Sequence, residues 1–199
     1  MRIARMIEKT GAEGPGIRSA VWMQGCPHHC RGCYAVDTHS FEGGREIGVD
    51  ELFAVISSAS PETEGVTFLG GEPLAQAAEL AVLLKKIKKT GLSVTVFTGF
   101  VYEDIERYGS PEQKEVLKYT DLLVDGPYIE EQRDLTRPLV GSSNQRFIFL
   151  TDRYSEKDIE ALRNGIEIRI DPEGTVRING MGDFPMMAEL FNSHGMLRI

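Results

Sequence analysis

The fold of this chain is restricted most by a repeated alternation of short apolar segments with helical patterns. The apolar segments that we predict to be strands are residues 19–25, 65–71, 93–99, 121–126 and 145–150. The predicted helices are residues 49–59, 73–91 and 101–119, the last with a break at residues 109–111. Such alternation is typical of a parallel sheet or barrel with right-handed crossovers, whose strands are apolar because both faces are covered. The sequence therefore predicts an α/β fold.

Several of the predicted strands end in glycine or in a small polar or acidic residue. These ends are Gly25, Gly70-Gly71, Thr98-Gly99 and Asp125-Gly126. In open parallel sheets and α/β barrels, ligands bind at the carboxyl edge of the strands. We therefore expect the functional site at this edge, where segments that are distant in the sequence meet.

The pattern changes after residue 150. Residues 154–165 are predicted to form a helix, and residues 166–180 alternate apolar and polar residues on both sides of a DPEG turn, which predicts a hairpin. A last short helix is expected within residues 186–195. A segment of about fifty residues without a clear core is marginal alone. We therefore expect residues 1–150 to form the core domain and residues 151–199 an extension packed on it.

The composition argues against several classes of function. The 199 residues carry a net charge of −8, with 41% apolar and 26% charged residues. An acidic surface argues against nonspecific nucleic-acid binding, which needs a basic face. No apolar run approaches the roughly 20 residues that span a bilayer, and the N-terminus lacks the apolar core of a signal peptide. We therefore expect a cytoplasmic protein with neither a nucleic-acid nor a membrane partner.

All three cysteines of the chain lie in the segment GCPHHCRGC, at Cys26, Cys30 and Cys33. In a reducing compartment, clustered cysteines indicate metal binding or catalysis more than disulfides. A redox pair of thiols would leave the third cysteine without a role. A structural zinc ion needs four ligands, so a histidine (His28, His29 or His39) would have to complete the site.

An iron–sulfur cluster accounts better for the number of cysteines. A 4Fe–4S cluster has four irons that thiolates normally ligate, so three cysteines leave one iron open to a substrate or cosubstrate. We expect His28 and His29 on the surface of the cysteine loop and not among the ligands, and Trp22 in the core.

The spacing C-x3-C-x2-C after a first strand resembles that of the radical S-adenosylmethionine superfamily. Further segments resemble motifs of this superfamily and of its glycyl-radical-enzyme activases, in particular the branch that activates anaerobic ribonucleotide reductases: GPGIR (14–18), GGEPL (70–74), FTGF (97–100), LLVDGPY (122–128) and GSSNQRF (141–147). Gly32 before the third cysteine and Tyr34 after it fit the same branch.

The resemblance implies a fold and a set of site residues. The fold would be a partial (β/α)6-type TIM barrel with a C-terminal helix and β-hairpin extension. The 4Fe–4S cluster would be ligated by Cys26, Cys30 and Cys33, and the methionine end of S-adenosylmethionine would be held by Gly70, Gly71 and Glu72. Thr98 and Asp125 would face the same pocket. The ribose or adenine would be contacted by Ser142, Ser143 and Asn144, unless these residues form a polar turn before the last strand.

The resemblance also implies a reaction. The enzyme would reductively cleave S-adenosylmethionine to a 5′-deoxyadenosyl radical, which abstracts hydrogen from a glycine of a partner glycyl radical enzyme. The partner suggested is an anaerobic ribonucleotide reductase, with a flavodoxin-like protein as electron donor. Two alternatives stay open: a radical enzyme acting on a small molecule or peptide, such as a 7-carboxy-7-deazaguanine synthase-like enzyme, and a non-enzymatic zinc-binding or partner-binding module.

Overall fold

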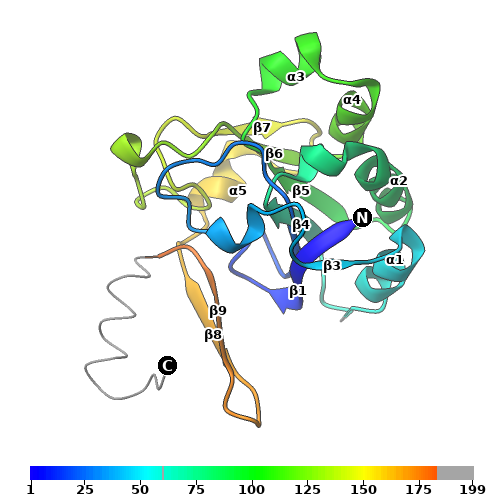
Figure 1. The fold of residues 1–199 in the computed structure, drawn as a ribbon, viewed down its shortest axis with the longest axis vertical. Helices are drawn as coiled ribbons and strands as arrows, with labels where there is room; N and C mark the ends of the chain where they lie inside the picture. Colours follow the sequence, from blue (N-terminus) through cyan, green and yellow to red (C-terminus); the bar gives the residue numbers. More distant parts are fainter. Residues whose placement is uncertain (60, 183–199) are drawn as a thin grey trace.

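The computed structural model describes residues 1–59 and 61–182, which form a seven-stranded mixed sheet and a separate two-stranded hairpin (Figure 1). The order of strands in the large sheet is β3-β1-β2-β4-β5-β6-β7. Its strands are β1 (Arg2–Thr10), β2 (Arg18–Met23), β3 (Arg45–Glu46), β4 (Gly65–Gly70), β5 (Ser93–Phe97), β6 (Leu122–Asp125) and β7 (Arg146–Phe149).

The centre of the sheet is parallel, as the sequence predicts. Strands β2, β4, β5 and β6 pair in parallel, each with the next. All residues of β2 and of β6 are buried, because helices and loops cover both faces of these strands. The carboxyl ends of the four strands therefore lie along one edge.

The prediction of a parallel sheet is wrong at β7, which pairs antiparallel with β6. A parallel neighbour needs a crossover, usually a helix. The segment between β6 and β7 contains a single 3-10 turn, η3 (Glu130–Gln132), in place of a crossover helix, so the chain returns in the opposite direction. Strand β1, which the sequence analysis did not predict, pairs antiparallel with both β2 and β3.

The expected partial (β/α)6 barrel is not confirmed. In the part of the chain that the structure describes, the sheet is open, with β3 and β7 at its two ends. Helical crossovers follow β2, β4 and β5, but not β6. The architecture that the structure shows is a mixed α/β fold with a mainly parallel sheet.

The helices form in the predicted places and pack on the sheet. They are α1 (Val49–Ser57), α2 (Ala77–Lys88), α3 (Tyr102–Tyr108), α4 (Pro111–Lys118) and α5 (Glu156–Glu160), with 3-10 turns η1 (Val36–Thr38) and η2 (Pro73–Gln76). In Figure 1, α1, α2 and α4 lie together on one side of the sheet. Leu80, Leu84 and Ile87 of α2 are fully buried at helical spacing and fill the main core. The predicted break is the start of α4, where Ser110 forms a capping box with Gln113.

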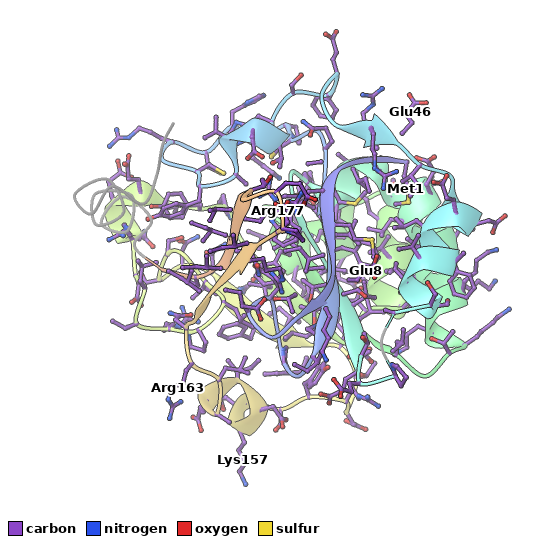
Figure 2. The ribbon with its side chains drawn as sticks, turned by 90° about the horizontal axis from the view of Figure 1, so that it is seen from below. Met1, Glu8, Glu46, Lys157, Arg163 and Arg177 are labelled. Carbon is purple, nitrogen blue, oxygen red and sulfur yellow. The ribbon has the colours of Figure 1, made fainter. Side chains whose placement is uncertain are left out.

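The predicted hairpin is present as β8 (Ile166–Ile170) and β9 (Val176–Gly180), which pair antiparallel. The hairpin lies beside β1 (Figure 2). It is attached there by hydrogen bonds: Arg169 donates from Nη2 to the carbonyl oxygen of Lys9 at 2.7 Å. Thr10 also donates from its hydroxyl to the Glu167 carboxylate at 2.8 Å. The short helix expected within residues 186–195 lies outside the described residues, and the division at residue 150 stays a prediction. No described helix has both the length and the apolar character needed to cross a membrane.

Candidate functional site

A cavity of about 460 Å³ lies at the carboxyl edge of the parallel strands. Its lining includes all three cysteines, Gly70–Glu72 at the end of β4, and Thr98 after β5. The sequence analysis predicted that the strand ends would meet at this edge, and the structure brings these residues together in one place.

The cysteine loop begins at a backbone conformation with positive φ, which favours glycine. Gly25 has a φ of +95°, and a Cβ atom there would lie 2.4 Å from Cδ1 of Phe41. The Gly25 amide donates to the Thr38 carbonyl at 2.8 Å and the Cys26 amide to the His39 carbonyl at 3.0 Å. The loop is thus closed at its base by its own later residues.

The thiols are surrounded by main-chain donors. The amide of Ala35 donates to Sγ of Cys33 at 3.4 Å, and the backbone of His28 and His29 acts to lower the pKa of the Cys26 thiol. Burial nevertheless raises the pKa of both the Cys26 and the Cys33 thiol above the ordinary value. A reactive redox thiol needs a lowered pKa, so this environment argues against the interpretation as a redox pair.

The GGEP segment is pressed against the start of the cysteine loop. The Gly71 amide donates to the Met23 carbonyl at 2.9 Å, and the Glu72 amide donates to the Gly25 carbonyl at 2.8 Å. A Cβ atom at Gly71 would lie 2.4 Å from the Gly25 carbonyl oxygen. A glycine is therefore required here because two backbone segments approach each other closely, which is a stricter demand than that of an ordinary turn.

The Glu72 carboxylate is 1% exposed and is fully engaged by the protein. One oxygen accepts from the Leu74 amide at 2.8 Å and the Thr98 hydroxyl at 2.9 Å. The other accepts from the Gly99 amide at 2.8 Å and lies 3.1 Å from Nε2 of His28. The prediction that His28 lies on the loop surface is wrong, because this carboxylate draws its imidazole into the cavity wall.

Asp125 is fully buried, but its side chain is not among those that line the cavity. Its carboxylate accepts from the Tyr102 amide at 2.8 Å and forms an ion pair with Arg146 at 2.5 Å. Arg146 also pairs with Glu103 at 2.7 Å, and these hydrogen bonds raise the pKa of Arg146. The next residue, Gly126, does line the cavity. Asp125 thus holds the strand end in place from behind.

Ser142 and Asn144 also lie behind the cavity wall. The Ser142 hydroxyl accepts from the Ile129 amide at 3.2 Å, and Asn144 donates from Nδ2 to the Pro127 carbonyl at 2.8 Å. Gln145 of the same GSSNQRF segment lines the cavity, and its Oε1 accepts from the Gly141 amide at 2.9 Å. The segment is therefore a braced polar turn that presents Gly141 and Gln145. The sequence analysis singled out the segment but not these two residues.

Sequence reasoning missed one wall of the cavity. Residues 178–181, at the end of the hairpin, line it together with Glu13. Glu13 accepts from Asn179 Nδ2 at 3.0 Å and from the Gly180 amide at 2.8 Å. Burial raises the pKa of the Glu13 carboxyl above its ordinary value. Trp22, which was expected in the core, lines the cavity as well as being buried, with the Arg5 guanidinium 4.9 Å from its ring.

The donor set suits a 4Fe–4S cluster. All three cysteines line one cavity, and the Cys33 sulfur accepts from a backbone N–H group, a kind of contact that stabilises thiolates that ligate iron. Within residues 1–59 and 61–182, no three histidine, cysteine or acidic side chains are grouped closely enough to hold a single metal ion.

Comparisons with known proteins agree with this geometry. Residues 12–148 match the model of the family described as 4Fe-4S single cluster domain. The anaerobic ribonucleoside-triphosphate reductase-activating protein of enterobacteria phage T4 is 32% identical over 150 residues, which are 73% of this chain and 92% of that protein. The pyruvate formate-lyase-activating enzyme of Clostridium pasteurianum is 36% identical over 131 residues, which are 63% of this chain. The chain spans about half the length of that enzyme, with 52% covered.

Among solved structures, QueE from Escherichia coli is similar with a TM-score of 0.41 and 23% identity, over 49% of this chain and 52% of that chain. A likeness of this size decides nothing about the fold or the function. The family match over residues 12–148 covers the cysteine loop, the GGEP segment and all four parallel strands. The chain therefore belongs to the radical S-adenosylmethionine family of 4Fe–4S proteins, in the branch of the activating proteins of glycyl radical enzymes.

Proposed function

We propose that this chain generates a glycyl radical in an anaerobic ribonucleotide reductase. The observation that carries the proposal is that the three cysteines and the GGEP segment line one cavity, within residues that match the family model. The partner is inferred from the name of the phage T4 relative, 92% of which this chain covers.

The proposed chemistry is a one-electron reaction. With a flavodoxin-like protein as reductant, the cluster would supply one electron that breaks the C5′–S bond of S-adenosylmethionine, which gives methionine and a 5′-deoxyadenosyl radical. The radical would then take one hydrogen atom from a glycine Cα of the partner. The products are methionine, 5′-deoxyadenosine and a glycyl radical in the partner, and the cluster has lost the one electron that the reductant supplied.

We assign the residues of this chain to holding, orienting and shielding roles. Cys26, Cys30 and Cys33 would ligate the cluster, and the backbone of Gly70 and Gly71 would bind the methionine end of the cosubstrate.

Other residues would act less directly. Glu72 and Thr98 are bonded to each other, so their hydroxyl–carboxylate pair would support the methionine site from beneath. Asp125, Ser142 and Asn144 would position Gly126 and Gln145, which lie on the cavity wall. Asp125 does so through its ion pair with Arg146.

The cytoplasm is the compartment that suits this chemistry, because free cysteines stay reduced there.

A second candidate function is a radical enzyme that acts on a small molecule or a peptide. One observation favours it: residues 178–181 of the hairpin line the cavity and lie outside the matched residues 12–148. Such a wall would narrow the path by which a large partner loop could enter the cavity. A hairpin that moves aside would restore that path for a protein partner.

The test begins with anaerobic reconstitution of the full chain with iron and sulfide. Dithionite reduction with S-adenosylmethionine should yield 5′-deoxyadenosine, measured by chromatography, in wild type and not in Cys30→Ala. The reductase encoded in the same genome is then added, and electron paramagnetic resonance should detect a glycyl radical in it. Cleavage without a glycyl radical favours the second candidate, and iron binding without cleavage refutes both.

A further inference from the structure

His28 occupies a fixed position in the middle of the cysteine loop. Its Nε2 lies 3.1 Å from a carboxylate oxygen of Glu72, and its side chain is 20% exposed. Its ring meets the Phe100 ring edge-on, with centroids 4.6 Å apart and an interplanar angle of 70°. A Cβ atom at Gly99 would lie 2.5 Å from Cδ2 of His28, so the imidazole fills the space that this glycine leaves open.

The carboxylate that meets His28 is itself immobilised. Glu72 already accepts from the amides of Leu74 and Gly99 and from the Thr98 hydroxyl. These donors belong to the segments that follow β4 and β5. The contact between Nε2 of His28 and the Glu72 carboxylate is a hydrogen bond when the imidazole is in the tautomer that carries its proton on Nε2.

The loop carries His28 between two of its cysteines, two residues after Cys26 and two before Cys30. The backbone amide of His28 is among the groups that lower the pKa of the Cys26 thiol, against the larger effect of burial. The backbone of this residue is thus part of the surroundings of a proposed cluster ligand, while its side chain meets a carboxylate that is bonded to the segments after two strands of the sheet.

We propose that His28 is a positioning residue, which fixes the cysteine loop against the sheet in the shape that binds the cluster, and that Glu72 acts on the cluster through it. If His28 were itself a metal ligand through Nε2, this atom would have to give up its contact with the Glu72 carboxylate. Among the described residues, no other histidine contacts that carboxylate. The inference goes beyond the proposed function, because it concerns retention of the cluster and does not depend on the identity of the radical acceptor.

The test measures how fast the reconstituted cluster is lost to an iron chelator, by its visible absorbance under anaerobic conditions. Loss of partners that support metal ligands typically weakens binding about 10–100-fold, so His28→Leu should lose the cluster about 10-fold faster than wild type. His28→Gln should restore retention, because its amide can donate near the place of Nε2. Gly99→Ala should accelerate loss in the same way, because the added methyl displaces the imidazole.

The matched control is His29→Asn, which changes the exposed neighbouring histidine at a φ of +47° that asparagine tolerates. It should retain the cluster as wild type does. Melting temperatures of the cluster-free proteins separate loss of the cluster from loss of the fold. If either His28→Leu or Gly99→Ala folds poorly, the rate of cluster loss is compared with wild type in the other variant.

Retention equal to wild type in both His28→Leu and Gly99→Ala would overturn the proposal. So would equally fast loss in His28→Gln and His28→Leu, since the hydrogen bond would then be irrelevant. A wild-type protein that holds its cluster but cleaves no S-adenosylmethionine would refute the proposed function, while leaving this comparison intact.

Discussion

Removing one hydroxyl from Tyr154 should destabilise the whole fold, because that hydroxyl serves a buried arginine. Arg18 is 0% exposed, and its charge is favoured from a distance by the carboxylates of Asp121 and Glu64, but each described hydrogen bond of its guanidinium goes to a neutral oxygen. Its guanidinium donates to Tyr154 Oη at 2.9 Å. Its other acceptors are oxygen atoms of Pro15, Val66, Thr67, Ser93 and Thr95. Burial lowers the pKa of Arg18, so each of these neutral acceptors helps to keep its charge inside the protein.

The magnitude follows from the bonds that are lost. Tyr154→Phe keeps the ring, but removes one acceptor of a charged donor and a second bond to Ser93 Oγ at 2.6 Å. A hydrogen bond to a charged group contributes about 1.5–3 kcal/mol. We therefore expect the free energy of unfolding to fall by about 2 kcal/mol. For a protein of this size that lowers Tm by about 4–8 °C.

Urea unfolding of the cluster-free protein, followed by circular dichroism, measures this change. Tyr108→Phe is the control, because Tyr108 is 74% exposed on α3 and should leave stability within about 0.5 kcal/mol. In a double-mutant cycle, Ser93→Ala and Tyr154→Phe should be non-additive, since both residues meet Arg18. A loss below about 0.5 kcal/mol in Tyr154→Phe would refute the reasoning, because the guanidinium would then not depend on this partner.

Two further perturbations test the cavity. Glu13→Gln keeps an oxygen acceptor for Asn179 and Gly180 but removes a buried charge. The pKa of Glu13 is raised above 4.5 in the folded state, so its stabilising contribution is complete below that value and is lost as the pH rises through the folded pKa. Urea unfolding should therefore show Glu13→Gln gaining stability relative to wild type from pH 4.5 upward, and a pH-independent difference would contradict this. Gly71→Ala should lower the rate of 5′-deoxyadenosine formation at least about 10-fold, because its Cβ would lie 2.4 Å from the Gly25 carbonyl oxygen. Gly48→Ala is its control, since a Cβ there meets its nearest atom, Glu51 Cβ, at 3.9 Å, and equal rates in the two variants would count against the close-approach argument.

The parallel centre of the fold could be predicted from local patterns in the sequence. Apolar runs, helical spacing and terminal glycines are properties of neighbouring residues, so β4, α2 and β5 could be predicted within a few residues of their ends. Strand β1 was missed because it is only partly buried and carries charged residues such as Arg5 and Glu8, unlike the fully buried β2 beside it. The direction of β7 depends on the absence of a helix before it, which a strand pattern alone does not express.

The cluster half of the site could be predicted for a similar reason. The cysteine spacing lies within eight residues, and GGEP follows a strand whose end must lie at the same edge. The way in which these segments lock together could not be predicted. The contact between His28 and Glu72 joins residues 44 apart, and nothing in the sequence around either residue distinguishes an imidazole held in the cavity wall from an exposed one.

The contribution of residues 178–181 of the hairpin to the cavity wall could not be predicted, because the residues that attach the hairpin to the core are far apart in the sequence. Asn179 and Glu13 are separated by 166 positions, and both read locally as ordinary turn or strand residues. Yet both line the same cavity as Gly70 and Gly71. Residues 12–148, shared with the family, contain the groups proposed to hold the cluster and the cosubstrate, whereas residues 178–181 do not belong to that shared part. If the proposed function holds, we expect the chemistry that makes the radical to reside in the part shared with the family, and the hairpin residues on the cavity wall to influence which group the radical meets.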